Sequence, residues 1–370
     1  MAFLYLWGNI YSSYNYRPDY IMVAQKSRLG NIELLRFVAM FLVLCLHANL
    51  LVFGPVEAAE LPNALSRLFF IQLTIIAVNV FILISGWFSI KPSAKGFLNL
   101  LFQVAFYFLG TIAIMVGFGK AQLSLDLIKS MLIMGSGYWF VTSYIVLYIL
   151  SPLLNTFIEH SNKRQLSIFL IIFYVVQTYY GWLLRDYEHF AYGYSALSFI
   201  GLYMLARFIR LYSSHIKIFK FSASTDFLIV LMIALCSTLI SALQKKIGFD
   251  GMSQIQYNNP LVIIQATYLL LAFSKMKLNS KFANLLGASS FAIYLIHSHP
   301  LIFPHFRDLI RSFDNGIADW LLVLKIIGVL IIIAIVCILI DQCRILFWKL
   351  FLKIKFFNNG IAYIDKKIKY

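Results

Sequence analysis

The sequence predicts an all-α membrane protein, a polytopic bundle of about ten transmembrane helices with both termini in the cytosol. Of its 370 residues 61% are hydrophobic and only 12% are charged. Several charge-free runs, such as Phe97 to Gly119 and Ser130 to Ile158, are long enough to cross about 30 Å of hydrocarbon as a helix. Because lipid offers no partner to an unpaired backbone group, these runs must be helical.

The apolar runs place the expected spans along most of the chain. Between the third and fourth spans, residues 124–134 form a shorter amphipathic segment, which we expect to lie at the interface or to be re-entrant. The ten expected spans are residues 31–51, 68–90, 97–119, 136–158, 165–184, 192–211, 226–244, 258–275, 284–303 and 319–341.

The distribution of basic residues sets the orientation of these spans. With ten spans and a cytosolic N-terminus, the segments on the cytosolic side hold 21 of the 31 Lys and Arg residues, and those on the other side hold eight. Cytosolic loops of membrane proteins are enriched in Lys and Arg. The asymmetry therefore favours this orientation and an even number of spans.

Three regions follow from this topology. Residues 1–30 are expected to form an N-terminal cytosolic tail, in which Met22 is a second candidate start, and residues 31–341 form the membrane domain. Residues 342–370 form a basic cytosolic tail that is suited to anionic lipid.

The net charge of +16 could indicate nucleic acid, but the basic residues are spread over short loops. We therefore expect the lipid bilayer as a partner and no nucleic acid. The four cysteines do not have the spacing of a metal site, so we expect no metal.

Two ionisable residues lie within the first expected span, Arg36 and His47. Eleven steps of about 100° bring a helix back to within roughly 20° of its starting direction, and they raise it by about 16 Å. One helix face then carries a cation near the cytosol and an imidazole deeper in, suited to proton abstraction. The alternatives are that Arg36 snorkels or pairs with Glu33, and that His47 only bonds a neighbouring helix.

Four segments carry residue patterns that occur in a defined order along the chain. The first has an arginine, ten residues and a histidine; the second has a Ser-Gly-aromatic end; the third has spaced tyrosines before a proline; the fourth contains Tyr-Leu-Ile-His. They are Asn31 to His47, Asn79 to Trp87, Tyr138 to Asn155, and Ser290 to Pro300. Together, in this order, they resemble the membrane acyltransferase-3 family.

This resemblance implies a membrane O-acyltransferase, in the form that lacks an extracytoplasmic esterase-like domain. Such an enzyme of the cell (plasma or inner) membrane would move an acyl group, most often acetyl, from cytosolic acetyl-CoA. The acceptor would be a hydroxyl of a cell-envelope or exported polysaccharide, or of its lipid-linked precursor. His47 would be the catalytic base or form an acyl-histidine intermediate, and Arg36 would bind or position the donor. The oligomeric state is left open.

The resemblance also indicates weaker site candidates. Lys91 and Lys95 occupy a segment where the family often has arginines, and they would contact donor phosphates unless they are ordinary cytosolic basic residues. Four further residues would contact substrate, namely Ser85, Trp139, Tyr144 and His297. Each also has a structural alternative, because small residues allow close helix packing, aromatics form interface belts, and a histidine can serve hydrogen bonding alone.

A transporter or flippase for a lipid-linked sugar is the alternative function, since such proteins also use buried basic residues and aromatic cavities. The arginine and histidine pair, with its companion segments, favours the acyltransferase.

Overall fold

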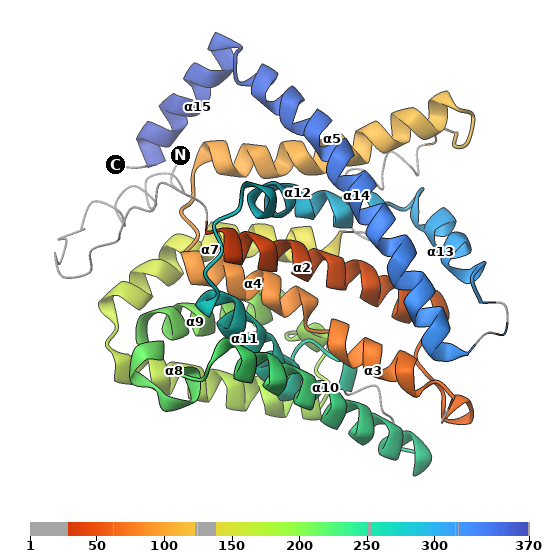
Figure 1. The fold of residues 1–370 in the computed structure, drawn as a ribbon. Coiled ribbons are helices and arrows are strands. Elements are labelled where there is room, and N and C mark those ends of the chain that lie inside the picture. The colour runs from red at the N-terminus through yellow and green to blue at the C-terminus, as the bar shows by residue number, and fades with distance from the viewer. Residues whose placement is uncertain are drawn as a thin grey trace.

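The computed structural model describes residues 29–368, apart from residues 62, 123, 125–137, 250–253, 315 and 317. Helices are the only regular elements in that described part, so the all-α fold is confirmed (Figure 1). The α-helices are α2 (Gly30–Leu46), α3 (Leu65–Thr74), α4 (Ala77–Phe88), α5 (Ala94–Gly117), α7 (Trp139–His160), α8 (Lys163–Val176), α9 (Ala196–Tyr212), α10 (Ala223–Lys246), α11 (Pro260–Lys275), α12 (Lys281–His297), α13 (Phe303–Arg311), α14 (Asp319–Phe351) and α15 (Lys355–Ile368). Two π-helices, η1 (His47–Leu51) and η3 (Gln177–Leu183), continue α2 and α8.

Eight helical stretches in the described residues are long and apolar enough to cross a membrane. They correspond to eight of the ten expected spans. The other two expected spans correspond to α11, with 16 residues, and α12, with 17. At 1.5 Å per residue these two helices are only about 24 to 26 Å long, which is short for a bilayer. Apart from Ser124, the expected segment 124–134 lies outside the described residues, and so does most of the N-terminal tail.

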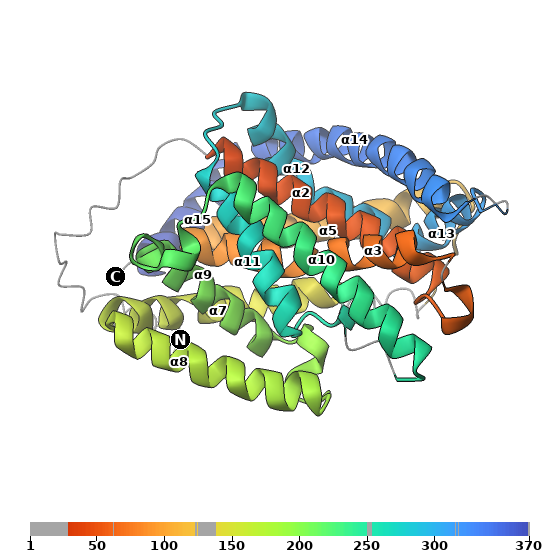
Figure 2. The ribbon, with the colours of Figure 1, turned by 60° about the horizontal axis from the view of Figure 1, so that its bottom comes forward.

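Helix α2 lies at the centre of the bundle, where it packs against α12, α4, α11, α3 and α14 (Figures 1 and 2). Its closest neighbour is α12. A Cβ atom added at Gly287 of α12 would lie 2.6 Å from the backbone oxygen of Glu33, so only glycine permits this approach. The central position follows from sequence, because α2 buries apolar residues around much of its circumference.

Several expected boundaries differ from those of the structure. The expected span 68–90 is two helices, α3 and α4, separated at Ile75 and Ile76. The expected span 284–303 ends early, because the chain turns at residues 298–302 and α13 starts at Phe303. Pro300 lies in this turn, where its missing N–H costs no helical bond.

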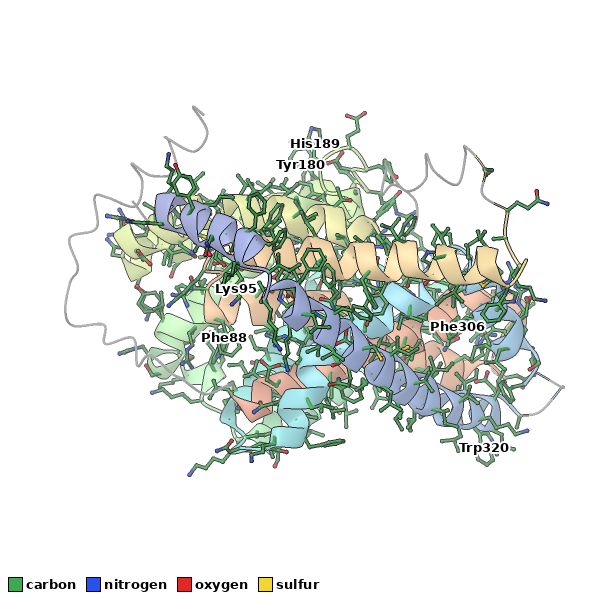
Figure 3. All side chains as sticks on the ribbon, turned by 90° about the horizontal axis from the view of Figure 1, so that it is seen from above. Phe88, Lys95, Tyr180, His189, Phe306 and Trp320 are labelled. Carbon is green, nitrogen blue, oxygen red and sulfur yellow. The ribbon has the colours of Figure 1, made fainter. Side chains whose placement is uncertain are left out.

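The C-terminal region is largely helical in the described residues. Helix α14 has 33 residues and continues ten residues past the expected end at Asp341. Beyond it, α15 packs against the start of α5, where the Ala94 backbone N–H donates to Asp365 Oδ1 at 2.5 Å. Figure 3 marks Lys95 in this first turn of α5. The expected boundary between residues 341 and 342 thus falls inside one helix.

The contacts between loops agree with the expected alternation of sides. Asn31, at the start of α2, donates through Nδ2 to the backbone oxygen of Phe273, which precedes a loop expected on the same side. At the other end, Arg311 Nη2 donates to the Val52 backbone oxygen at 2.9 Å. Helix ends assigned to one side therefore meet one another.

The outer faces of the peripheral helices are apolar. Ile171 of α8, Leu239 of α10 and Ile332 of α14 are each more than 60% exposed. Trp320, at the start of α14, also points outward (Figure 3). Such a surface suits the hydrocarbon of a bilayer rather than water.

Candidate active site

His47 lies at the point where α2 changes from an α-helix to the π-helix η1. Single π-helical turns are rare in proteins overall, and those that occur are often found at functional sites. Two side chains brace this turn, because Arg67 Nε donates to Asn49 Oδ1 at 3.3 Å and Asn49 Nδ2 donates back to the Arg67 backbone oxygen at 3.2 Å. The turn therefore holds the His47 backbone in a defined place.

The structure brings His47 together with His297, the last residue of α12. His47 Nδ1 lies 2.9 Å from His297 Nε2, and the two rings meet edge to face with centroids 5.0 Å apart. The residues are 250 positions apart in the sequence. The close packing of α2 and α12 thus forms a histidine dyad, His47 and His297, within the bundle.

Further contacts surround the dyad. His297 Nδ1 meets the backbone oxygen of Ile293, one turn earlier in α12. The Ser298 hydroxyl lies 3.2 Å from His297 Nε2 and 3.4 Å from His47 Nδ1. The ring of Phe306 packs 5.5 Å from the His297 ring, centroid to centroid. His297 is therefore held on several sides.

The two rings differ in accessibility. His297 is only 2% exposed, whereas His47 is partly exposed. His47 Nε2 makes no hydrogen bond with any residue that the structure describes. The open nitrogen of the dyad is thus on His47, which suits reaction with a substrate.

Arg36 occupies the opposite end of α2 and pairs with Glu33. Its Nη1 atom lies 2.6 Å from both carboxylate oxygens of Glu33, which is the local pairing that the spacing allowed. The Arg36 side chain is 26% exposed, while that of Glu33 is 6% exposed. Arg36 thus keeps part of its guanidinium open while Glu33 fixes its direction.

Ser85 and Tyr144 lie close to each other, with 3.4 Å between their hydroxyl oxygens. Tyr144 belongs to an aromatic cluster that extends across α4, α7 and α12 to the dyad. Each neighbouring pair of its rings has centroids 5.4 to 6.3 Å apart. The cluster consists of Phe81, Phe140, Tyr144, Phe291, Tyr294 and His297.

Trp139 lies in a different aromatic group. Its ring packs 4.3 Å from Tyr194 and 5.9 Å from Tyr257, centroid to centroid, at the start of α7. No ring contact between Trp139 and the dyad occurs in the described residues. Tyr144 and Trp139 both contact Phe140, and each is connected to His297 only through other rings, Phe140 and then Tyr294.

Lys91 and Lys95 lie at the far end of the bundle from the dyad, on both sides of the loop between α4 and α5. Both side chains are exposed. The loop between them is fixed, since the Tyr148 hydroxyl accepts from the Ser93 backbone N–H at 2.9 Å. The site candidates thus divide into an inner group near Arg36, Lys91 and Lys95 and an outer group near the dyad.

Sequence reasoning missed the polar side chains that hold this loop. The Tyr203 hydroxyl accepts from the Ile90 backbone N–H at 3.0 Å and donates to Asn155 Oδ1 at 2.6 Å. Asn155 Nδ2 in turn donates to the Ile90 backbone oxygen. The spaced tyrosines and Asn155 of α7 were visible in the sequence, but their partners were not.

Two arginines of α9 were also missed. Arg207 Nη1 donates to the Trp87 backbone oxygen, and the Arg210 guanidinium stacks 4.7 Å above the Trp87 ring. Their i, i+3 spacing, which places both on one helix face, was the only signal in the sequence. They add two cations beside the loop that carries Lys91.

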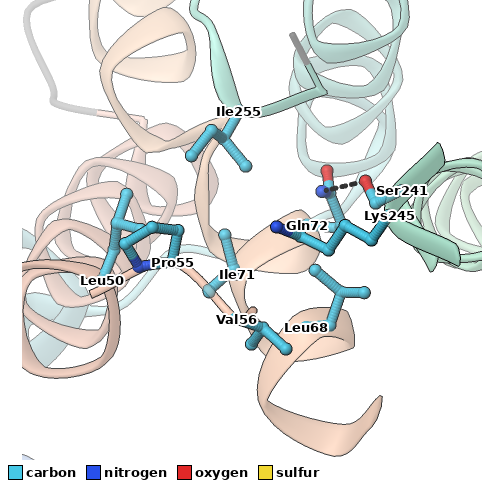
Figure 4. Close-up of a pocket in the computed structure, with 9 residues that line it drawn as sticks. All are labelled: Leu50, Pro55, Val56, Leu68, Ile71, Gln72, Ser241, Lys245 and Ile255. Carbon is cyan, nitrogen blue, oxygen red and sulfur yellow. Dashed lines mark hydrogen bonds between the residues drawn. The ribbon is translucent and has the colours of Figure 1, made fainter. Parts of the chain in front are cut away.

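A cleft opens on another side of η1. It encloses about 250 Å³, part of it open to solvent, and Gln72 Nε2 donates to Ser241 Oγ at its wall (Figure 4). Its wall includes Leu50 but not His47, so the cleft is separate from the dyad. The lining residues are Leu50, Pro55, Val56, Leu68, Ile71, Gln72, Ser241, Lys245 and Ile255.

Comparison with known families gives one match. The family model described as an acyltransferase domain matches residues 29–341, which is most of the chain. The protein therefore belongs to the membrane acyltransferase-3 family, as the four segments indicated. Comparison with curated proteins and with solved structures gave no match.

Proposed function

We propose that the protein is an O-acyltransferase of the cell membrane. It moves an acyl group, acetyl being the expected one, from cytosolic acyl-CoA to a hydroxyl of an envelope or exported polysaccharide or its lipid-linked precursor. Membership of the acyltransferase family supports the transfer of an acyl group. The observation that carries the proposal is the partly exposed His47 ring, with Nδ1 2.9 Å from His297 and Nε2 open.

The open nitrogen has a direct chemical use. A sugar hydroxyl is a weak nucleophile until a base takes its proton. In the direct route, His47 Nε2 takes that proton while the hydroxyl oxygen bonds to the thioester carbonyl carbon. The carbon–sulfur bond then breaks, and the CoA thiolate takes the proton back from His47, leaving an ester and free CoA.

A two-step route uses the same nitrogen. His47 Nε2 bonds to the carbonyl carbon and the carbon–sulfur bond breaks. The CoA thiolate takes the proton that the ring carried on Nδ1 and leaves as a thiol, so a neutral acyl-imidazole remains. The acceptor hydroxyl then attacks this acyl-imidazole and restores the histidine. Release of CoA before the acceptor is added, with ping-pong kinetics, would identify this route.

The inner group of residues suits the anionic donor. Arg36 keeps part of its guanidinium open, and Lys91 and Lys95 are exposed at the end of the bundle expected to face the cytosol. Arg207 and Arg210 add guanidinium groups beside the same loop. Such cations bind phosphate and pyrophosphate groups well, and arginine does so with two parallel hydrogen bonds.

Three candidates, two along the aromatic cluster and one at the outer end of α7, suit the acceptor. Ser85 and Tyr144 supply hydroxyls next to the aromatic cluster, and Trp139 presents a large ring at the outer end of α7. Aromatic faces stack on sugar rings, while hydroxyls bond their polar edges. Tyr144 is connected to the dyad through that cluster, so we place the acceptor along it.

A transfer assay tests the proposal. The full-length protein in detergent would be mixed with radiolabelled acetyl-CoA and with chemically deacetylated surface polysaccharide from the producing cells. We expect label in the polysaccharide with the natural protein and with His160→Gln, a change at an exposed ring on the end of α7. We expect none with His47→Ala. Movement of a lipid-linked sugar across vesicles without acyl-CoA, and without transfer, would contradict the proposal.

A further inference from the structure

We propose that His297 does not bind substrate but is a positioning residue for His47. It holds the His47 ring in the tautomer that carries hydrogen on Nδ1, and this leaves the Nε2 lone pair open as the base. The inference rests on the proposed function, because it assigns the chemistry of the same nitrogen. It is carried by the contacts of the dyad and by the accessibility of its two rings.

The first step concerns His297. Its Nδ1 atom faces the backbone oxygen of Ile293, which can only accept a hydrogen bond. The hydrogen of a neutral His297 ring must therefore be on Nδ1, and its Nε2 atom carries only a lone pair. Packing by Phe306 and an exposure of 2% keep the ring in this orientation.

The second step concerns the bond between the rings. His47 Nδ1 and His297 Nε2 are 2.9 Å apart, a hydrogen-bond distance at which two bare lone pairs would repel. Since His297 Nε2 has no hydrogen, His47 Nδ1 must donate one. Charging the buried His297 ring instead would require a neighbouring anion, and no carboxylate pairs with it in the described residues.

Ser298 fits the same arrangement. Its hydroxyl oxygen is 3.2 Å from His297 Nε2 and 3.4 Å from His47 Nδ1. The hydroxyl can donate to His297 Nε2 or accept from His47 Nδ1. In both cases the hydrogen stays on His47 Nδ1.

The third step concerns the open nitrogen. The bond that one ring nitrogen of a histidine makes decides which nitrogen carries the proton. With Nδ1 donating, a neutral His47 ring has its free lone pair on Nε2, the atom without a partner in the described part of the chain. When Nε2 takes a proton, the bond from Nδ1 to His297 becomes charge-assisted and stabilises the imidazolium.

Replacing His297 by either of two amide side chains of different length distinguishes the positioning role from simple packing. In His297→Gln the amide oxygen reaches about as far as the former Nε2 atom and can accept from His47. In His297→Asn the shorter amide reaches only the former Nδ1 position. We expect kcat to fall by about 100-fold in His297→Asn and by less than about tenfold in His297→Gln, with KM for acetyl-CoA unchanged in both.

The tautomer is measured directly by nitrogen-15 NMR of the full-length protein labelled at histidine, with the His47 signals assigned by their loss in His47→Gln. We expect a protonated Nδ1 and an unprotonated Nε2 in the natural protein and in His297→Gln, and a shift toward protonated Nε2 in His297→Asn. His160→Gln is the matched control, because its ring is exposed and distant in the chain.

A protonated Nε2 on His47 in the natural protein would overturn the inference, as would natural kcat in His297→Asn. If His297→Asn fails to fold, the spectrum of the natural protein still decides. The two proposals fail separately: the expected tautomer without any acyl transfer would contradict the function, whereas transfer by a ring with the opposite tautomer would contradict the positioning role.

Discussion

The two ends of α2 carry different chemistry on one helix. At the inner end, Arg36 is paired with an anion three residues earlier, Glu33, and both are charged groups. At the outer end, His47 is paired with a second imidazole from another helix, His297. The inner end can hold an anion, and the outer end can take a proton. In the proposed reaction a thioester donor would use the first and a hydroxyl acceptor the second, so the helix would connect two half-sites about 16 Å apart along its axis.

The largest effect is expected at the outer end of α2. His47→Ala removes the nitrogen that takes the proton, so we expect kcat to fall by about 10³-fold or more. Binding of acetyl-CoA should change little, because the inner end is intact. Single-turnover transfer of label, together with equilibrium binding of acetyl-CoA, measures both. Normal turnover would remove the proposed base.

A change at the inner end should show the opposite pattern. Arg36→Met keeps a side chain of similar length but removes its charge and its ion pair with Glu33. We expect KM for acetyl-CoA to rise by about 10- to 100-fold, since hydrogen bonds to charged groups contribute about 1.5 to 3 kcal/mol. Initial rates at varied donor concentration give this value. A fall in kcat at unchanged KM would show that Arg36 acts in chemistry instead.

The contact between α2 and α12 should matter to both ends. A Cβ at Gly287 would meet the Glu33 backbone oxygen at 2.6 Å, so Gly287→Val must push the helices apart. We expect about 1 to 3 kcal/mol of lost stability, the usual cost of overpacking, and reduced turnover as the dyad separates. Thermal unfolding in detergent measures the first effect. Gly110→Val of α5 is the control, because nothing lies within 4 Å of an added Cβ there.

The smallest expected effect is at the exposed lysines. Lys91→Gln and Lys95→Gln should each raise KM for acetyl-CoA by about two- to fivefold, and the difference from the natural protein should shrink at high salt. The donor's KM at low and at high ionic strength tests this. Equal KM values for all three proteins at low salt would assign both lysines to orientation in the membrane alone.

The sequence predicted the helical membrane fold because apolar runs of bilayer length have only one stable solution in lipid. It placed the spans but not all of their ends. The break between α3 and α4 lies inside a run without charged residues, where mean hydropathy stays high. The end of α12 was predicted six residues late, since the turn before α13 has an apolar sequence on both sides.

The two ends of α2 also differ in how far their contacts could be predicted from the sequence. The pairing of Arg36 with Glu33 was one of the interpretations of the sequence, because side chains three residues apart are neighbours on a helix surface. The sequence did not predict that His297 positions His47, because the contact between the two rings depends on how α2 and α12 pack. The hydrogen-bond network of Asn155 and Tyr203 around the loop before α5 depends on packing as well.

The two histidines should act together as one base, and a double-mutant cycle measures this coupling. Single-turnover rates would be measured for the natural protein, His47→Gln, His297→Asn and the double variant. We expect His297→Asn to lower the rate by about 100-fold in the natural protein and to have no further effect once His47 is changed. Losses that multiply in the double variant would contradict it, since His297 would then act independently of His47.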